Sequence, residues 1–136
     1  MSIDNALING VMKVYQSKGV GKFFSVNFLK QQDDEFVFDV SFPSDCLNPQ
    51  GTVQGGMIAS VLDDCTALCV LFSTKGKRFP NSTDFHTTFH RPLLLEPAII
   101  KASILKIGKN IASVEGKIFN RKNMLCLLYT SPSPRD

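Results

Sequence analysis

The stretch that decides the fold reads NPQGTVQGGMIASVLDDCTALCVLF and runs from Asn48 to Phe72. Its first four residues are turn formers. After Gln54 the apolar residues recur at helical spacing, at Met57, Val61, Cys65, Leu68 and Phe72. Most of the positions between them are apolar too, and a helix that is hydrophobic nearly all round is a buried one. The stretch therefore predicts a central helix over residues 54–72, which ends before the Lys-Gly-Lys segment at residues 75–77.

Alternating apolar and polar residues on both sides of this helix predict a sheet. The expected strands cover residues 24–28, 36–42, 82–89, 98–107, 111–119 and a segment that begins near Met124. Residues 3–17 have helical spacing, with Asp4 or Ser2 as the candidate N-cap. A sheet needs its apolar face covered, and the central helix is the only large cover. The pattern predicts an α+β domain in which an antiparallel sheet wraps around a central helix.

Length and composition indicate one ordinary globular domain. At 136 residues, 43% hydrophobic and 20% charged, the chain can bury a core without disulfide bonds. The net charge of +3 is mild, and the basic residues form small groups such as Lys75, Lys77 and Arg78. Because no basic stripe is interleaved with aromatic residues, we expect no nucleic-acid partner. A few lysines near a pocket mouth would suit an anionic ligand such as coenzyme A.

Targeting signals and cysteines favour a cytoplasmic protein. The N-terminal residues show no basic segment followed by an apolar run, so no signal peptide is expected. Residues 51–74 are interrupted by Asp63 and Asp64 and are not expected to span a membrane. The four cysteines lack metal-ligand spacing, and Cys65 and Cys69 are expected to be buried free thiols. A reducing compartment fits this usage best.

The last eleven residues, CLLYTSPSPRD from Cys126 to Asp136, resemble the in-frame translation of a transposase adapter used in short-read sequencing. We expect them to be read-through and not native sequence, although Ser-Pro repeats are also typical of disordered tails. The native domain is then represented by residues 1–125, with its C-terminal strand truncated.

The motif in residues 48–64 resembles the signature of PaaI-like acyl-CoA thioesterases, which belong to the hotdog-fold thioesterase superfamily. The matching positions are Asn48, Gly51, Gly55, Gly56 and Asp63, all in register. The sequence departs from the commonest form at Gln54, where that form has histidine. The resemblance spans roughly residues 20–125. It implies a hotdog fold, hydrolysis of an acyl-CoA, a homodimer or homotetramer, and neither metal nor cofactor.

The resemblance assigns the central chemistry to Asp63 and Gly56. Gly56 lies in the first turn of the helix, where backbone amides lack intrahelical partners, and its amide would bind the thioester oxygen. Gly55 has no side chain and would let the substrate approach the backbone closely. Asp63 would activate water or attack the carbonyl directly. The two residues lie seven positions apart, roughly 10 Å along one helix, so acting together requires two antiparallel helices related by a twofold axis. Simpler alternatives are a tight turn at the glycines and a structural carboxylate at Asp63.

The resemblance assigns supporting roles to five further residues. Asn48 would hold the carbonyl or the water through its amide, and Ser82 would position water from the second protomer. Each of the two residues also has a purely structural explanation: Asn48 as a turn residue and Ser82 as an ordinary serine at a strand edge. Gln54 replaces a titratable ring by an amide, which alters orientation and pH dependence but not the reaction class. Asp64 is expected to be structural or to contact substrate indirectly, and Arg91 is a candidate substrate-binding residue.

Two other functions remain as alternatives. A hotdog hydratase or dehydratase would need a histidine paired with the carboxylate, and position 54 lacks one. A non-catalytic acyl-CoA-binding module would leave Asp63 dispensable. His86 and His90 share one side of a strand, but no cysteine or carboxylate at supporting spacing joins them, so we expect no metal site.

Overall fold

The computed structural model describes residues 4–78, 80 and 84–131. Its helices are α1 (Asn5–Ser17), α2 (Gly19–Phe24), the short 3-10 helix η1 (Ser44–Cys46) and α3 (Gly55–Ser73). Its strands are β1 (Val26–Gln32), β2 (Glu35–Val40), β3 (His86–Phe89), β4 (Ala98–Ile107), β5 (Ala112–Phe119) and β6 (Leu125–Thr130). The predicted central helix is therefore confirmed to within one residue at each end.

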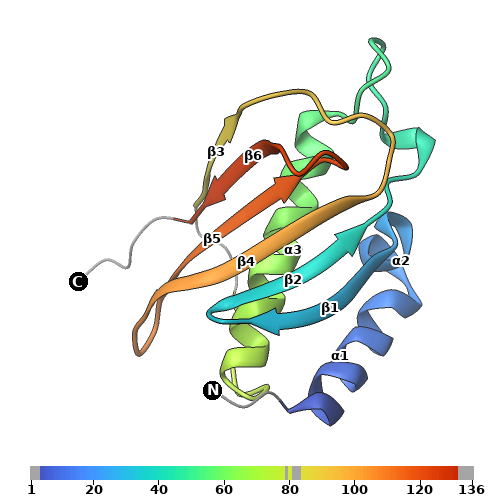
Figure 1. Cartoon of the computed structure of the whole chain (residues 1–136). Coiled ribbons are helices and arrows are strands. Elements are labelled where there is room, and N and C mark those ends of the chain that lie inside the picture. The colour runs from blue at the N-terminus through green and yellow to red at the C-terminus, as the bar shows by residue number, and fades with distance from the viewer. Residues whose placement is uncertain (1–3, 79, 81–83, 132–136) are drawn as a thin grey trace.

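The strands form one antiparallel sheet in the order β1-β2-β4-β5-β6-β3. Helix α3 runs across one face of this sheet, and α1 and α2 lie beside β1 at its edge (Figure 1). The predicted antiparallel sheet around a central helix is thus confirmed. In the described part of the chain the two outer strands are β1 and β3, and the short strand β3 leaves one of its sides unpaired.

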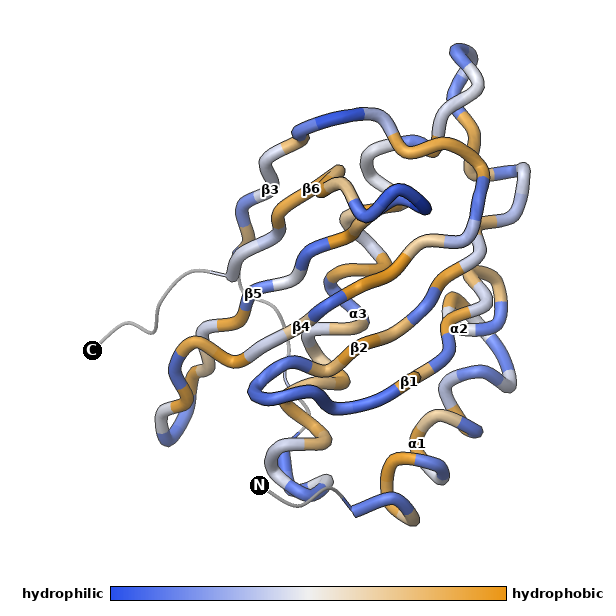
Figure 2. Tube along the Cα trace, in the orientation of Figure 1, coloured by the Kyte–Doolittle hydropathy of each residue, from blue (hydrophilic) through white to orange (hydrophobic). Residues whose placement is uncertain are grey.

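Helix α3 packs mainly against β4 and β5. A Cβ added to Gly116 in β5 would lie 3.1 Å from Cγ2 of Thr66 and 3.3 Å from Cδ2 of Leu62, so the helix rests directly on the strand at this glycine. By length and composition α3 could cross a bilayer, but 56% of its most apolar window is buried inside the fold. Apolar residues are concentrated along α3 and the strands that it covers (Figure 2).

Phenylalanines join the β1–β2 hairpin to the end of α3. The Phe28 ring lies 5.5 Å from the rings of Phe38 and Phe72, in edge-to-face geometry, and Phe36 lies 5.9 Å from Phe72. Aromatic pairs at these distances add about 0.5–1.5 kcal/mol each beyond area burial. The phenylalanine-rich face of the predicted hairpin is therefore part of the core.

The N-terminal region differs from the prediction at Phe24. Asp4 caps α1 as expected, its carboxylate accepting from Leu7 N at 3.0 Å. Gly19 breaks the helix with a φ of +69°, but the chain then forms α2 before the sheet begins. Phe24 therefore lies in a helix and not in a strand, because the left-handed Ser25 (φ 54°) delays the extended chain until Val26.

Two features at the other end of the chain refine the prediction. The strand expected over residues 82–89 is described only as β3, from His86, and residues 81–83 lie outside the described part. Strand β6 is built largely from the adapter-like segment. It lies between β5 and β3, and Cys126, Leu127 and Tyr129 are fully buried.

Candidate active site

The site begins at the N-terminus of α3, which Gln54 caps. The Gln54 side-chain oxygen accepts from Met57 N at 2.9 Å, and Gln54 N donates to Cys46 O at 2.8 Å. The first i to i−4 bond of the helix runs from Ile58 N to Gln54 O, so the amides of Gly55 and Gly56 precede this ladder. These two amides lie at the positive end of the helix dipole, where negative charge is stabilised.

The two glycines have different surroundings. A Cβ on Gly55 would lie 2.7 Å from Cε1 of Phe89, so the Phe89 ring occupies the space that any other residue would fill. A Cβ on Gly56 would meet the Gln54 side-chain oxygen at 3.0 Å, and Gly56 is exposed. Packing against Phe89 therefore explains why residue 55 is glycine. Gly56 is exposed to solvent, and the atoms nearest to its added Cβ belong to the Gln54 side chain.

Asp63 lies two turns further along α3 and is partly buried. Its Oδ1 accepts a 2.8 Å hydrogen bond from the hydroxyl of Tyr129, a fully buried residue of β6. The Tyr129 ring stacks on Phe85, with 5.1 Å between the ring centroids. The carboxylate therefore has a defined orientation at the border between α3 and the sheet.

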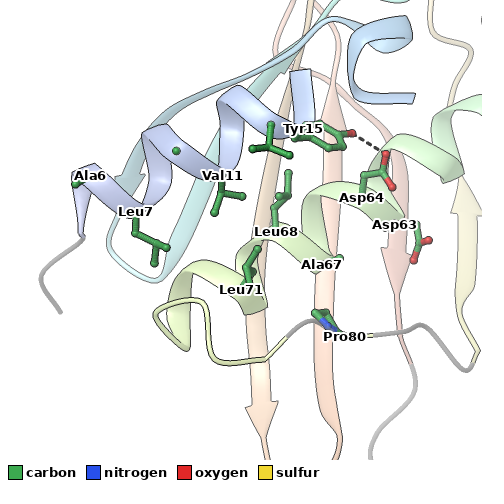
Figure 3. A pocket seen from close by; sticks show the side chains of 12 residues that line it. Ala6, Leu7, Val11, Tyr15, Asp63, Asp64, Ala67, Leu68, Leu71 and Pro80 are labelled. Atoms are coloured by element: carbon green, nitrogen blue, oxygen red, sulfur yellow. Dashed lines mark hydrogen bonds between the residues drawn. The ribbon is translucent and has the colours of Figure 1, made fainter. Parts of the chain in front are cut away.

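Asp64 points toward the N-terminal helix. Its Oδ2 accepts from the Tyr15 hydroxyl at 2.6 Å, a bond between α1 and α3 (Figure 3). Burial raises the pKa of the Asp64 carboxyl, the Tyr15 hydrogen bond opposes that rise, and the neighbouring Asp63 charge adds to it. Burial, and then the bond to Asp64, raise the pKa of Tyr15, so the phenol stays protonated and donates.

A groove between α1 and α3 joins these carboxylates to an apolar wall. Its volume is about 840 Å³, and both Asp63 and Asp64 line it together with residues such as Val11 and Leu68. Pockets of this size, mostly apolar with a few polar groups at one place, are typical of small-molecule sites.

Asn48 is placed in the loop before the helix. Its Oδ1 accepts from the backbone amides of Gln50 and Thr52 at 3.0 and 3.1 Å, and its Nδ2 donates to the Thr52 hydroxyl at 2.9 Å. This is the turn chemistry that the sequence left open. The expected contact of the Asn48 amide with substrate or water stays a prediction.

The remaining predicted residues lie at or beyond the edge of the described site. Ser82 lies outside the described residues. Arg91 is exposed just after β3, where its amide donates to Cys126 O at 3.3 Å. His86 and His90 are exposed, and among the described residues no group of three potential ligands could hold a metal ion.

The fold thus forms two neighbourhoods on α3, one around Gln54, Gly55 and Gly56, and one around Asp63 and Asp64. Three aromatic residues that shape them were not predicted from the sequence: Tyr15, Phe89 and Tyr129. Tyr15 follows Val11 by four positions on the predicted N-terminal helix, so a hydroxyl on the face turned to the core was a usable signal. Tyr129 belongs to the adapter-like segment, for which the sequence predicts no native role.

Comparisons with known proteins identify the family and the fold. The family model described as the thioesterase superfamily matches residues 50–127, which include Gly55, Gly56, Asp63 and Asp64. A protein of Thermoplasma acidophilum, provisionally named an esterase, is 29% identical over 104 residues, which is 76% of each chain.

Solved structures share the fold. The E. coli PaaI protein from the phenylacetic acid degradation operon superposes with a TM-score of 0.80 at 15% identity, over 96% of this chain and 93% of that one. Thioesterase superfamily member 2 of Mus musculus gives 0.78 at 22% identity, over 96% of each chain. These likenesses confirm the hotdog fold. The family model covers 78 residues (50 to 127) of 136, more than half of the sequence, so the chain belongs to the thioesterase superfamily.

Proposed function

We propose that the protein hydrolyses an acyl-CoA thioester to a free acid and coenzyme A, with Asp63 as the catalytic carboxylate. The observation that carries the proposal is the partly buried Asp63 carboxylate in the wall of a mostly apolar groove. Burying a carboxylate is costly unless it is paired or used, and such groups cluster at functional sites. Membership of the thioesterase superfamily supports thioester cleavage as the reaction.

In the proposed reaction, water adds to the thioester carbonyl carbon while Asp63 takes its proton. The carbonyl oxygen becomes an oxyanion and accepts from the Gly56 amide at the positive end of α3. Collapse of the tetrahedral intermediate breaks the C–S bond, and the thiolate leaves with the proton that Asp63 holds. In the alternative route Asp63 attacks the carbonyl itself, and water then hydrolyses the resulting anhydride.

The oxyanion donor and the carboxylate come from two protomers in this proposal. On one helix Asp63 and Gly56 are seven residues, or roughly 10 Å, apart, too far to act on one carbonyl group. Within the described residues β3 has an unpaired side, and an open edge of this kind is a template for pairing with a second chain. Pairing two β3 strands antiparallel across a twofold axis would set the two α3 helices antiparallel.

The supporting residues act around these two groups. Gln54 holds the start of the helix in place of a histidine, so it contributes no titration near neutral pH. In this proposal Asn48 contacts the carbonyl or the water, Ser82 positions the water, and Arg91 contacts the substrate. Four buried free thiols suit a reducing cytoplasm.

The reaction is tested by free-thiol release from acetyl-, hexanoyl-, decanoyl- and phenylacetyl-CoA, measured with a thiol reagent. We expect steady turnover of at least one substrate. Tight binding of acyl-CoA without turnover would instead identify a binding module. Hydration of crotonyl-CoA without thiol release would identify a hydratase.

The shared site is tested by mixing two inactive variants. Asp63→Asn removes the carboxylate, and Gly56→Pro removes the amide donor in a first helical turn, where proline is tolerated. Each homodimer lacks one group at both sites, but the mixed dimer has one complete site. Activity that returns on unfolding and refolding the variants together supports the proposal. Activity that stays absent, with mixed dimers present, contradicts it.

A further inference from the structure

We propose that the groove between α1 and α3 holds a linear aliphatic acyl chain, and that Gly10 keeps the groove open for a long chain. The proposal rests on the proposed thioester hydrolysis and names the substrate class of the same site. The groove has a volume of about 840 Å³.

The groove has a polar end and an apolar end. In Figure 3 Asp63 and Asp64 lie at one end, and Leu7 of α1 faces Leu71 of α3 at the other. A reacting carbonyl beside Asp63 would therefore have its alkyl chain directed along an apolar channel. Coenzyme A would remain outside.

Charge favours an uncharged occupant. Among the described lining residues the ionisable side chains are Tyr15, Asp63 and Asp64, and none is a cation. An anionic group is therefore repelled from the polar end and finds no counter-ion deeper in the groove. A protein segment seated there would cover Asp63 and exclude substrate, which is incompatible with the proposed reaction. The acyl part of a thioester is uncharged and is itself part of the substrate, so it fits the groove without blocking Asp63.

The length of the groove suggests the length of the chain. Leu7 and Tyr15, both lining residues, are eight positions apart on α1, which spans about 12 Å. An extended alkyl chain advances about 1.3 Å per carbon, from a C–C bond of about 1.5 Å, so about nine carbons fit. An aromatic acyl group would fill only the part next to the aspartates.

Gly10 is the position on α1 that keeps this space open. It lines the groove, and a Cβ built on it meets no atom within 4 Å. Glycine inside a helix is unfavourable relative to alanine, so its presence calls for a reason. Gly10 is exposed and lies between two other lining residues of the same helix, Leu7 and Val14, so in this proposal a large side chain at residue 10 takes up space in the groove.

Gly10→Phe tests the proposal, with Asn9→Phe as the control. Asn9 is the exposed neighbour of Gly10 and does not belong to the described lining of the groove. The probes are non-hydrolysable alkyl-CoA thioethers, and we expect wild type to bind the decyl analogue more tightly than the ethyl analogue. Gly10→Phe should lose at least about tenfold in affinity for the decyl analogue, the cost of roughly two buried methylenes, and keep its affinity for the ethyl analogue. Asn9→Phe should resemble wild type.

The binding readout separates this inference from the reaction. Affinity that does not change with alkyl length in wild type, or an equal loss for short and long analogues in Gly10→Phe, overturns the inference while thiol release can still occur. Length-dependent binding without thiol release supports the groove and contradicts the proposed reaction. A change of oligomeric state in Gly10→Phe alone, seen by sedimentation, would show that the groove is a subunit interface and would overturn the proposal.

Discussion

The Tyr15 hydroxyl donates a 2.6 Å hydrogen bond to Asp64 Oδ2, which ties the first helix of the chain to the central helix one residue from Asp63. This bond holds α1 against α3 beside the groove that the two helices form. Asp63 accepts its hydrogen bond from the Tyr129 hydroxyl instead. Two adjacent carboxylates thus have two different tyrosine donors on two different elements.

Tyr15→Phe removes the bond but keeps the ring. We expect the free energy of unfolding to fall by about 1–2 kcal/mol, because a partly buried carboxylate loses its donor. Urea denaturation measures this change. Ser17→Ala, which removes an exposed hydroxyl from the same helix, should change stability by less than about 0.5 kcal/mol. Equal effects of the two substitutions would show that the Tyr15–Asp64 bond contributes nothing.

Asp64→Asn should stabilise the protein at neutral pH. The pKa of Asp64 is raised in the folded state, chiefly by burial, so the native protein holds this proton more tightly than the unfolded chain does. Its favourable contribution is therefore present below the unfolded pKa of about 3.9 and is lost as pH rises through the folded pKa. The neutral amide carries no such loss and can still accept from Tyr15.

Urea midpoints at a series of pH values check this expectation. The advantage of Asp64→Asn should be largest at neutral pH and shrink as the pH falls toward the ordinary carboxyl range. A variant that is less stable than wild type at neutral pH would mean that the bond to the charged carboxylate outweighs its burial.

Gly55 and Gly56 should respond differently to a methyl group. At Gly55 the added Cβ lies 2.7 Å from the Phe89 ring, whereas at Gly56 it meets the end of the flexible Gln54 side chain. In double-mutant cycles with Phe89→Leu, Gly55→Ala should show a coupling of about 0.5–1 kcal/mol and Gly56→Ala almost none. Equal couplings would contradict the placement of Phe89 over Gly55.

How far the sequence predicted this site depends on the residue. The helical spacing of Met57 to Phe72 predicted α3 and its burial, since a helix that is apolar on nearly all sides is stable only inside the protein core. Phe24 was assigned to a strand because alternation does not reveal a left-handed Ser25. The contact of Phe89 with Gly55 joins residues 34 positions apart, and no local pattern encodes such a pairing.

Strand β6 supports a prediction about the end of the chain. Its residues pair with both β5 and β3, and Tyr129 is fully buried, so a chain that stops after Met124 should fail to fold at room temperature. A chain that stops after Ser131 should melt at the temperature of the full-length protein. Circular dichroism checks both, and equal melting of all three chains would show that β6 is dispensable.

The origin of the same segment is a separate question. We propose that residues 126–136 derive from adapter read-through, and that the native gene encodes a different ending. Sequencing the locus from genomic DNA should give another sequence after Leu125. An identical genomic sequence would make Tyr129 a native partner of Asp63 and would end the adapter proposal.

The most direct test of Asp63 as the catalytic carboxylate compares thiol release from decanoyl-CoA by wild type, Asp63→Asn and Asp34→Asn. Asp34→Asn removes a charge from the exposed β1–β2 turn and serves as the matched control. We expect Asp63→Asn to lose at least about a hundredfold in kcat, the scale of general-base catalysis, while binding and folding stay intact and the control keeps full activity. A folded Asp63→Asn variant with undiminished kcat would contradict the assignment of Asp63 as the catalytic carboxylate.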